Sequence, residues 1–368
     1  MFFLAVFIFC LYFCQSTEIH ADQFNSLEKQ LLDLKGDLCL TRRNGTIRNP
    51  HVLLIGGRNN ALLYGRKSLL TFEAYYPAIQ TDQSCHKFYA DLSISTIRQS
   101  FVAGALAGQI IIAGGSLGNS DSEQRNSNTA EVFDWYTRTW SRLPNTIHYH
   151  TTGAGATITS SSIATPHSTD TKAVSNELFC ICGDQHRFAP QNYCECINST
   201  LGEWQAITAM PRKRSQFAAV AYRNRMYAMG GWGQNAWNSM DIYDAETRAW
   251  MSESQVMKHS KKELAAAALD NFIYVCGGYD YKLETVTNSC TRYSVETNEW
   301  FDMPPMIIER ANFALVSLGS NIVAFGGERA DRSITDSVEI YSPITQTWQR
   351  TYSMAQGRSH FAAVGMGH

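Results

Sequence analysis

The most conspicuous residues that could do chemistry are four cysteines close to one histidine. Cys180 and Cys182 form one Cys-x-Cys pair. Cys194 and Cys196 form a second, and His186 lies between the pairs. Thiolate and imidazole groups gathered in this way can bind zinc. However, other parts of the chain carry apolar residues at the matching positions, and free cysteine packs as a small hydrophobic side chain. We therefore favour core packing of free thiols, with a disulfide between two strands or a metal site as the alternatives.

A second set consists of acidic residues that could suggest hydrolysis, since paired carboxylates act as general acid and base. Its members recur at one position of a repeating pattern: Glu73, Glu131, Glu195, Asp241 and Glu339. One acid per repeat indicates architecture, so we expect them to bind backbone groups or arginines between neighbouring repeats. The sequence also lacks a phosphate loop, a Gly-x-Ser-x-Gly motif and an HExxH motif. We predict no catalytic residue, no metal and no cofactor.

A third set could bind a ligand, because arginine makes two-pronged contacts to carboxylates and aromatic side chains supply rigid contact area. Its members are Arg58, Asn60, Arg98, Arg214, Trp232, Lys261, Tyr279, Arg310 and Arg358. In the third repeat Tyr149 aligns with the arginine position to within one residue. We expect this set to bind an acidic peptide or loop. The alternative is that the arginines are structural and pair with carboxylates or carbonyls of the neighbouring repeat.

These residues are positioned by an internal repeat, most regular between Arg214 and Trp250. Its markers are glycines at Gly56-Gly57, Gly114-Gly115, Gly183, Gly230-Gly231, Gly277-Gly278 and Gly326-Gly327, and tryptophans at Trp140, Trp204, Trp250, Trp300 and Trp348. Each copy contains short apolar runs separated by polar or glycine turns, which predicts a four-stranded meander, here strands a to d. One meander cannot bury both its faces, so neighbouring copies must stack on it.

The glycine pairs, these tryptophans and the strand c aromatic residues Tyr75, Phe133, Tyr243, Tyr293 and Tyr341 resemble the kelch repeat. The resemblance implies an all-β fold, a six-bladed propeller. The first copy has no strand a, and the chain ends in an isolated strand a at Arg358–Val364. We therefore expect the last strand to complete the first blade, which removes the sheet edges that an open array would expose. The set of basic and aromatic residues should then lie on the face that carries the d–a and b–c connections.

The predicted domains are an apolar leader at residues 1–16, a helix and linker at 17–50, and the propeller at 51–368. The leader is a candidate signal peptide, or else the start of a truncated chain. The helix and linker resemble the end of a BACK domain, with a generic amphipathic helix as the alternative. An insertion rich in Ser, Thr and Ala is expected near residues 160–177. Free cysteines favour the cytoplasm, and a working leader would favour secretion.

Composition limits the function. The chain has 31 Lys+Arg against 33 Asp+Glu, which argues against a nucleic-acid partner. The resemblance implies a non-catalytic protein-binding module, most similar to the substrate-recognition end of kelch-like cullin-RING ubiquitin ligase adaptors. Cullin would be reached only through the absent BTB region or a partner. The alternatives are an actin-binding kelch protein, a secreted propeller that binds protein or glycan, and a sugar-modifying propeller enzyme.

Overall fold

The computed structural model describes residues 52–61, 65–68, 72–76, 85–89, 94–118, 125–134, 137–160, 176–186, 189–198, 202–252 and 256–365. The predicted leader, the predicted helix and linker, and residues 161–175 of the expected insertion lie outside these ranges. Within the described ranges all regular elements are β-strands, so no helix there could cross a bilayer.

The described strands form six four-stranded antiparallel sheets, called blades 1 to 6. From its inner to its outer strand, blade 1 contains β32 (Ala362–Gly365), β1 (Val52–Ile55), β4 (Phe72–Tyr76) and β5 (Cys85–Tyr89). In the same order, blade 2 contains β7 (Val102–Leu106), β8 (Gln109–Ala113), β11 (Ala130–Asp134) and β12 (Thr139–Leu143). Blade 3 contains β13 (Ala154–Ser160), β14 (Asn176–His186), β15 (Ala189–Asn198) and β16 (Trp204–Ile207). Blade 4 contains β17 (Ala218–Tyr222), β18 (Arg225–Met229), β19 (Met240–Asp244) and β20 (Ala249–Ser252). Blade 5 contains β22 (Ala265–Leu269), β23 (Phe272–Cys276), β26 (Cys290–Ser294) and β27 (Glu299–Met303). Blade 6 contains β28 (Ala314–Leu318), β29 (Asn321–Phe325), β30 (Val338–Ser342) and β31 (Thr347–Arg350).

Shorter strands lie in the connections between blades and between strands b and c. They are β2 (Arg58–Ala61), β3 (Gly65–Ser68), β6 (Arg98–Gln99), β9 (Ser116–Leu117), β10 (Arg125–Asn126), β21 (Lys261–Lys262), β24 (Tyr279–Asp280) and β25 (Thr285–Val286). Both kinds of connection leave the strands on the same side of the propeller. We call that side the loop face.

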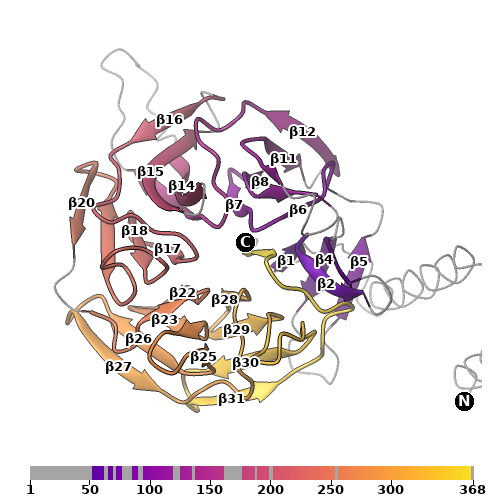
Figure 1. Cartoon of the computed structure of the whole chain (residues 1–368), viewed down its shortest axis with the longest axis vertical. Coiled ribbons are helices and arrows are strands. Elements are labelled where there is room, and N and C mark those ends of the chain that lie inside the picture. Colours follow the sequence, from indigo (N-terminus) through magenta and orange to yellow (C-terminus); the bar gives the residue numbers. More distant parts are fainter. Residues whose placement is uncertain are drawn as a thin grey trace, which may run out of the picture. The chain divides into compact units, whose positions relative to one another are not determined.

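The blades are arranged in a ring around a central channel (Figure 1). The innermost strands contact one another in the order β7, β13, β17, β22, β28, β32, and β32 contacts β7. The last strand pairs antiparallel with β1, from Val52 opposite Gly365 to Ile55 opposite Ala362. The expected pairing between the two ends of the repeat region is therefore present, and the strand order of the kelch propeller is as predicted.

Aromatic residues fill the space between neighbouring blades. The strand c tyrosine packs on the strand d tryptophan of its own blade, with 5.2 Å between the ring centroids of Tyr341 and Trp348. The Nε1–H of Trp348 donates to the carbonyl of Pro304 in the loop that follows blade 5, at 3.0 Å. A large apolar plate with one polar edge can thus join two sheets while its only donor stays satisfied.

The double glycine serves close backbone approach. In blade 4, Gly231 has φ +98°, and a Cβ there would lie 2.6 Å from the Cβ of Phe217. In blade 3 the large and the small residue have exchanged strands. Asp184 stands at the position of Gly231, and Gly153 stands at the position of Phe217. A Cβ on Gly153 would lie 2.7 Å from the Gly183 carbonyl. The third copy therefore departs from the glycine pattern without loss of the contact, because the small residue has moved to the opposing strand.

The preferred interpretation of the cysteines is wrong. Disulfides join Cys180 to Cys196 and Cys182 to Cys194 in blade 3, and a third joins Cys276 to Cys290 in blade 5. The partners stand directly opposite one another on adjacent antiparallel strands, with Cα atoms 4.0, 4.2 and 4.2 Å apart. Side chains approach closely at such positions. These cysteines are also buried in the core, so they combine core packing with the cross-strand bond that was the second choice.

Candidate functional site

The four arginines predicted to bind a ligand are completely buried. Each guanidinium donates to the carbonyl of the glycine that ends strand b of its own blade: Arg98 to Gly114 at 3.0 Å, Arg214 to Gly230 at 2.8 Å, Arg310 to Gly326 at 2.7 Å and Arg358 to Gly56 at 3.0 Å. Each also lies against the acid that strand c supplies: Glu131, Asp241, Glu339 and Glu73. We call these pairs the blade clamps.

A clamp also holds the loop that enters its blade. In blade 6, Arg310 donates to Glu339 at 2.7 Å, and the same carboxylate accepts the amide of Ile307 at 2.6 Å. Burial lowers the pKa of Arg310, and Glu339 opposes that shift. A buried arginine without its acid would be an uncompensated charge. The clamps are therefore structural. The acids bind backbone and arginine groups as expected, but each arginine belongs to the acid's own blade, and only the backbone amides come from the loop that follows the preceding blade.

Two corrections follow for the predicted basic ring. The arginines do not reach the surface, because their side chains turn inward to strands b and c. Lys261 is buried too: its Nζ donates to the Ser289 carbonyl at 3.0 Å, and burial lowers its pKa to about 8, partly opposed by Asp280. In blade 3 the arginine position belongs to His150 rather than Tyr149, whose side chain is exposed. The alternative, structural interpretation of the arginines is the one that this geometry favours.

The remaining predicted residues lie on the loop face. Arg58, in β2, donates to Glu328 at 3.1 Å and its side chain is 14% exposed. Asn60 lies in the same strand, opposite Arg66 of β3. Trp232 and Tyr279 are half-buried at the start of the b–c connections of blades 4 and 5. Arg58, Trp232 and Tyr279 are therefore the predicted residues whose described side chains reach this face.

Sequence analysis missed six polar residues that encircle the channel mouth. Each stands two positions after the clamp position: Ser100, Thr152, Gln216, Glu263, Asn312 and His360, called the mouth ring. Every one has a left-handed backbone conformation, with φ between 50° and 61°. The amide of each donates to the carbonyl of the preceding member, from Thr152 to Ser100 at 3.1 Å around to Ser100 to His360 at 3.0 Å. The constant offset from the arginine was a usable signal in the sequence.

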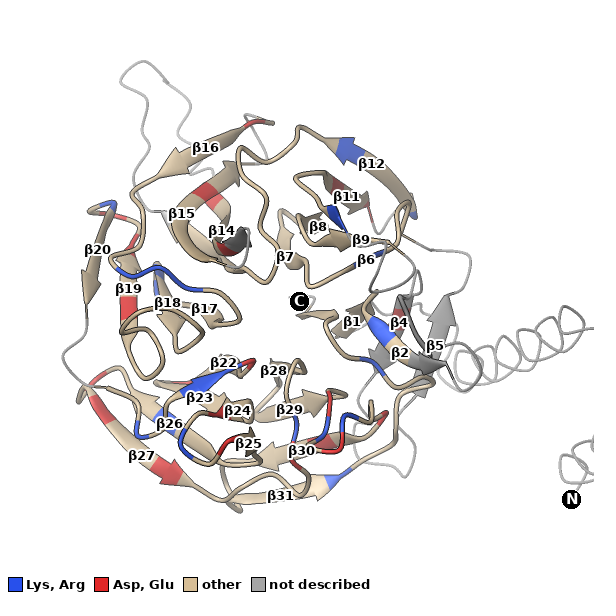
Figure 2. Ribbon diagram, viewed as in Figure 1, with Lys and Arg blue, Asp and Glu red and all other residues tan. Residues whose placement is uncertain are grey.

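The mouth ring and the residues that follow it line a cavity of about 160 Å³. An acidic and a basic side chain, those of Glu263 and Lys262, lie close together here. Glu263 accepts a hydrogen bond from the amide of the Gln216 side chain at 3.0 Å and lies 3.5 Å from Lys262. Burial raises the pKa of Glu263, while Lys262 lowers it and Glu328 raises it. Figure 2 shows basic and acidic residues interspersed around the blades rather than gathered in one sector.

An apolar surface lies beside the mouth on blades 4 and 5. It comprises Trp237, Tyr279, Tyr281 and Leu283, called the aromatic patch. Trp237 and Tyr281 have ring centroids 5.2 Å apart, and Tyr279 and Tyr281 lie 6.0 Å apart. Trp237 is 44% exposed and Leu283 is 61% exposed. Backbone bonds from Lys261 to Trp237 and from Tyr281 to Ser260 join the patch to the segment that enters the mouth ring.

Further exposed apolar side chains occur on the connections between blades, among them Ile147, Tyr149, Val256 and Ile307. Aromatic side chains with polar edges are enriched at the centres of protein interfaces, and grouped exposed apolar side chains mark interaction sites. The arrangement can therefore contact another protein through a polar mouth flanked by rigid aromatic rings.

Comparisons with known proteins agree with this fold. Residues 102–327 match the KLHDC2/KLHL20/DRC7 Kelch-repeats domain, and residues 309–354 match the Kelch motif. "Kelch-like protein 36" of Rattus norvegicus is 26% identical over 163 residues, which cover 43% of this chain and 26% of that protein. "Kelch-like protein 23" of Homo sapiens is 25% identical over 154 residues, 42% of this chain and 27% of that protein.

A third relative, "Kelch-like protein 26" of Danio rerio, is 33% identical over 110 residues, 28% of this chain and 18% of that protein. The chain thus spans about a quarter of the length of the first two relatives, for which the matched shares are 26% and 27%. The domain match over residues 102–327 covers more than half of the 368 residues, and the chain belongs to this kelch-repeat domain family.

Proposed function

We propose that this chain is a protein-interaction module that holds a segment of a partner protein against the loop face of its propeller. The observation that carries the proposal is the aromatic patch beside the polar mouth ring. Trp237, Tyr281 and Leu283 offer apolar contact area, and the mouth ring offers donors and acceptors on a rigid backbone cycle. Apolar anchors beside hydrogen-bonding groups are the features with which a protein surface holds a peptide segment.

The ligand we propose is apolar or aromatic in its anchoring residues rather than acidic. Acidic preference depended on the arginines, which are buried in the blade clamps. The two cations nearest the mouth also have acidic neighbours, since Arg58 pairs with Glu328 and Lys262 lies near Glu263. An acidic segment would meet these carboxylates as well as the cations.

The resemblance to kelch-like relatives supports a specific form of the proposal, in which the propeller is the substrate receptor of a cullin-RING ubiquitin ligase adaptor. Propeller baits carrying Trp237→Ala with Leu283→Ala should lose most partners captured by the unchanged chain, because buried aromatic anchors dominate binding energy. Ile344→Ala is the matched control, since Ile344 is 86% exposed in the c–d turn on the opposite face. Equal partner sets for both variants would rule out the aromatic patch as the docking surface.

The ligase role has its own readout. A partner that depends on the aromatic patch should accumulate in cells when cullin activation is blocked. Capture of actin filaments by the patch would instead identify an actin-binding protein. A patch-dependent partner whose level does not respond to the block would exclude the ligase role while leaving protein binding intact.

A second candidate, a secreted propeller that binds protein, is favoured by the three disulfides. Disulfides persist in oxidising compartments and are rare in the cytosol. Protein isolated from cells under alkylating, non-reducing conditions should show Cys276 linked to Cys290 if the chain matures in the secretory pathway. Finding both cysteines alkylated in the native protein would support a cytoplasmic site of action.

A further inference from the structure

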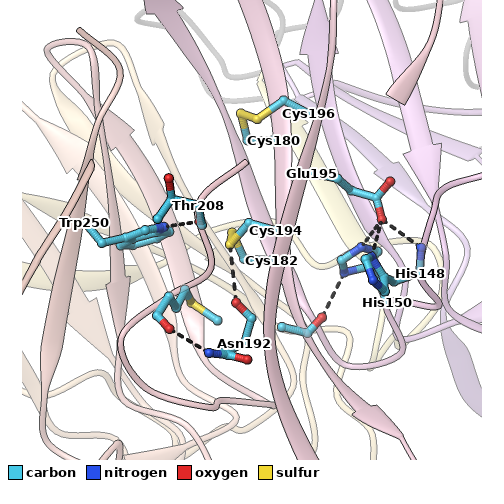
Figure 3. The surroundings of a disulfide bond; sticks show 12 residues. His148, His150, Cys180, Cys182, Asn192, Cys194, Glu195, Cys196, Thr208 and Trp250 are labelled. Carbon is cyan, nitrogen blue, oxygen red and sulfur yellow. Dashed lines mark hydrogen bonds and ion pairs between the residues drawn. A yellow bond between two sulfur atoms is a disulfide. The ribbon is translucent and has the colours of Figure 1, made fainter. Parts of the chain in front are cut away.

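Blade 3 replaces the buried arginine of the blade clamp with histidine. His150 stands where the other blades carry Arg98, Arg214, Arg310 and Arg358, or Lys261 in blade 5. Its acid, Glu195, occupies the usual strand c position. A second imidazole, that of His148, lies two residues earlier in the same loop. Figure 3 shows both imidazole groups directed at the Glu195 carboxylate, on the opposite side of β15 from the disulfides.

The three side chains converge on one point. His150 Nε2 lies 2.8 Å from Glu195 Oε1, and His148 Nδ1 lies 3.5 Å from the same oxygen. The Nδ1 atom of His148 is buried and has no hydrogen-bond partner. All three ligand atoms lie within 4.8 Å of one another. From this convergence we propose that His148, His150 and Glu195 bind a divalent metal ion of the zinc type.

The hydrogen bonds of His150 call for a positive charge at this point. Its Nδ1 lies 2.9 Å from the Gly183 carbonyl, so Nδ1 carries the proton that this carbonyl accepts. In a neutral ring Nε2 then presents a lone pair to the carboxylate of Glu195. The 2.8 Å contact therefore needs either a second proton on the ring, which would donate to the carboxylate, or a metal ion bound to both atoms. In four of the other blades the guanidinium supplies that charge.

Blade 4 provides the closest comparison within the chain. There two arginines, Arg212 and Arg214, bind the two oxygens of Asp241 from the same sequence positions as His148 and His150. Two guanidinium groups bring two positive charges to that carboxylate. In blade 3 imidazoles replace both guanidinium groups, and a divalent cation held by them would bring two positive charges to Glu195. The identical spacing shows that the loop already directs both side chains at the acid.

Tyr193 holds the two imidazoles in place. It stacks on His148 with 3.9 Å between ring centroids and meets His150 edge-on at 5.5 Å. Its hydroxyl donates to Asp184 at 2.8 Å. Other blades carry a small hydroxyl residue here, such as Thr129 or Ser239, so the larger ring accompanies the smaller histidine. Ligands with fixed orientation and an Nδ1–H bonded to a carbonyl are typical of metal-binding histidines.

The distances favour zinc among metals that accept imidazole and carboxylate ligands. Tetrahedral zinc with bonds of about 2.0–2.2 Å places its ligand atoms about 3.3 Å apart. The observed 2.8 and 3.5 Å lie on either side of that value, so small side-chain movements would complete the site. His148 is 35% exposed, which leaves an approach from solvent for the ion and for a water as fourth ligand.

Zinc and cobalt titration of the purified full chain tests the proposal, with disulfides intact and remaining thiols alkylated. We expect one equivalent to bind, with a tetrahedral cobalt absorption spectrum. His148→Ala and His150→Arg should each weaken binding at least about tenfold, since even the loss of a group that hydrogen-bonds to a metal ligand costs about 10- to 100-fold. His150→Arg restores the residue of the other blades, and a thermal melt checks that it folds. His148→Ala removes a half-exposed side chain and gives an independent test.

The matched control is His259→Ala. His259 holds the equivalent position in blade 5, where it lies 3.2 Å from Asp280 and has Lys261 rather than a second histidine beside it. Its loss should leave zinc affinity unchanged. Absence of saturable binding to the unchanged chain would overturn the proposal and leave a proton on His150 as the source of charge. Equal affinity of the His148→Ala variant and the unchanged chain would also overturn it.

Discussion

Replacing Arg310 by methionine should destabilise the propeller severely. The guanidinium donates to the carbonyls of Gly326 and Ser337 and to Glu339, and neither charged side chain is exposed. The substitution leaves a buried carboxylate with only the amides of the entering loop as partners. Breaking a buried ion pair from one side costs about 3–5 kcal/mol of unfolding free energy. Urea unfolding followed by tryptophan fluorescence measures this loss.

Arg225→Met is the matched control. Arg225 pairs with Asp244 at 2.9 Å, but its side chain is 43% exposed, so its loss should cost less than about 1 kcal/mol. Arg310→Met with Glu339→Gln should recover part of the loss, because it removes the uncompensated charge. Equal destabilisation by Arg310→Met and Arg225→Met would contradict the structural role of the clamp. Lost partner binding with unchanged stability would restore the arginine as a ligand contact.

Three further predictions concern single features of the fold. The pKa of Lys261 is depressed to about 8, so the unfolded chain binds more protons than the folded chain between about pH 8 and pH 10.5, and the free energy of unfolding should rise with pH there. Lys261→Met should abolish that rise in urea titrations at several pH values. The same rise in the variant would contradict the depressed pKa. Gly231→Ala should destabilise more than Gly202→Ala, since a Cβ meets Phe217 only at the former, although both have positive φ; equal urea midpoints would show that the close approach is unimportant. Changing Cys276 and Cys290 to alanine should cost about 3 kcal/mol, as expected for a closed loop of this length, and no change in the midpoint under oxidising conditions would mean that the bond does not form.

The positions of the repeats along the chain could be predicted from the sequence because they depend on a local pattern. Glycine, tyrosine and tryptophan recur at set distances, and four apolar runs between turns predict a meander regardless of its neighbours. The incomplete first copy and the isolated last strand predicted the pairing of β32 with β1. Strand alternation also placed the d–a and b–c connections on one face, where the aromatic patch lies.

The sequence did not show which polar side chains are buried and which are exposed. A fixed distance from the glycine locates Arg310 along the chain, but whether its side chain points to solvent or inward depends on the acid that strand c places beside it. Sequence analysis considered pairing of Arg310 with a carboxylate, but it could not show which acid lies beside it or that the pair is enclosed. The insertion in the third copy obscured its alignment with the other copies, so Tyr149 was aligned with the arginine position that His150 occupies in the structure. The convergence of His148 and Glu195 then escaped notice, because 47 residues separate the bonded backbone amide from the carboxylate.

The sequence by itself determined that six copies of one β-meander build this molecule and that its two ends share a blade, because hydrophobic periodicity and turn chemistry act over a few residues. Tertiary structure alone decided which polar side chains face solvent and which are enclosed. It brought cysteines on adjacent strands together, buried the arginines against acids more than 25 residues away, and left the aromatic patch and the mouth ring outside. Those choices depend on register and packing between strands, which no local pattern encodes.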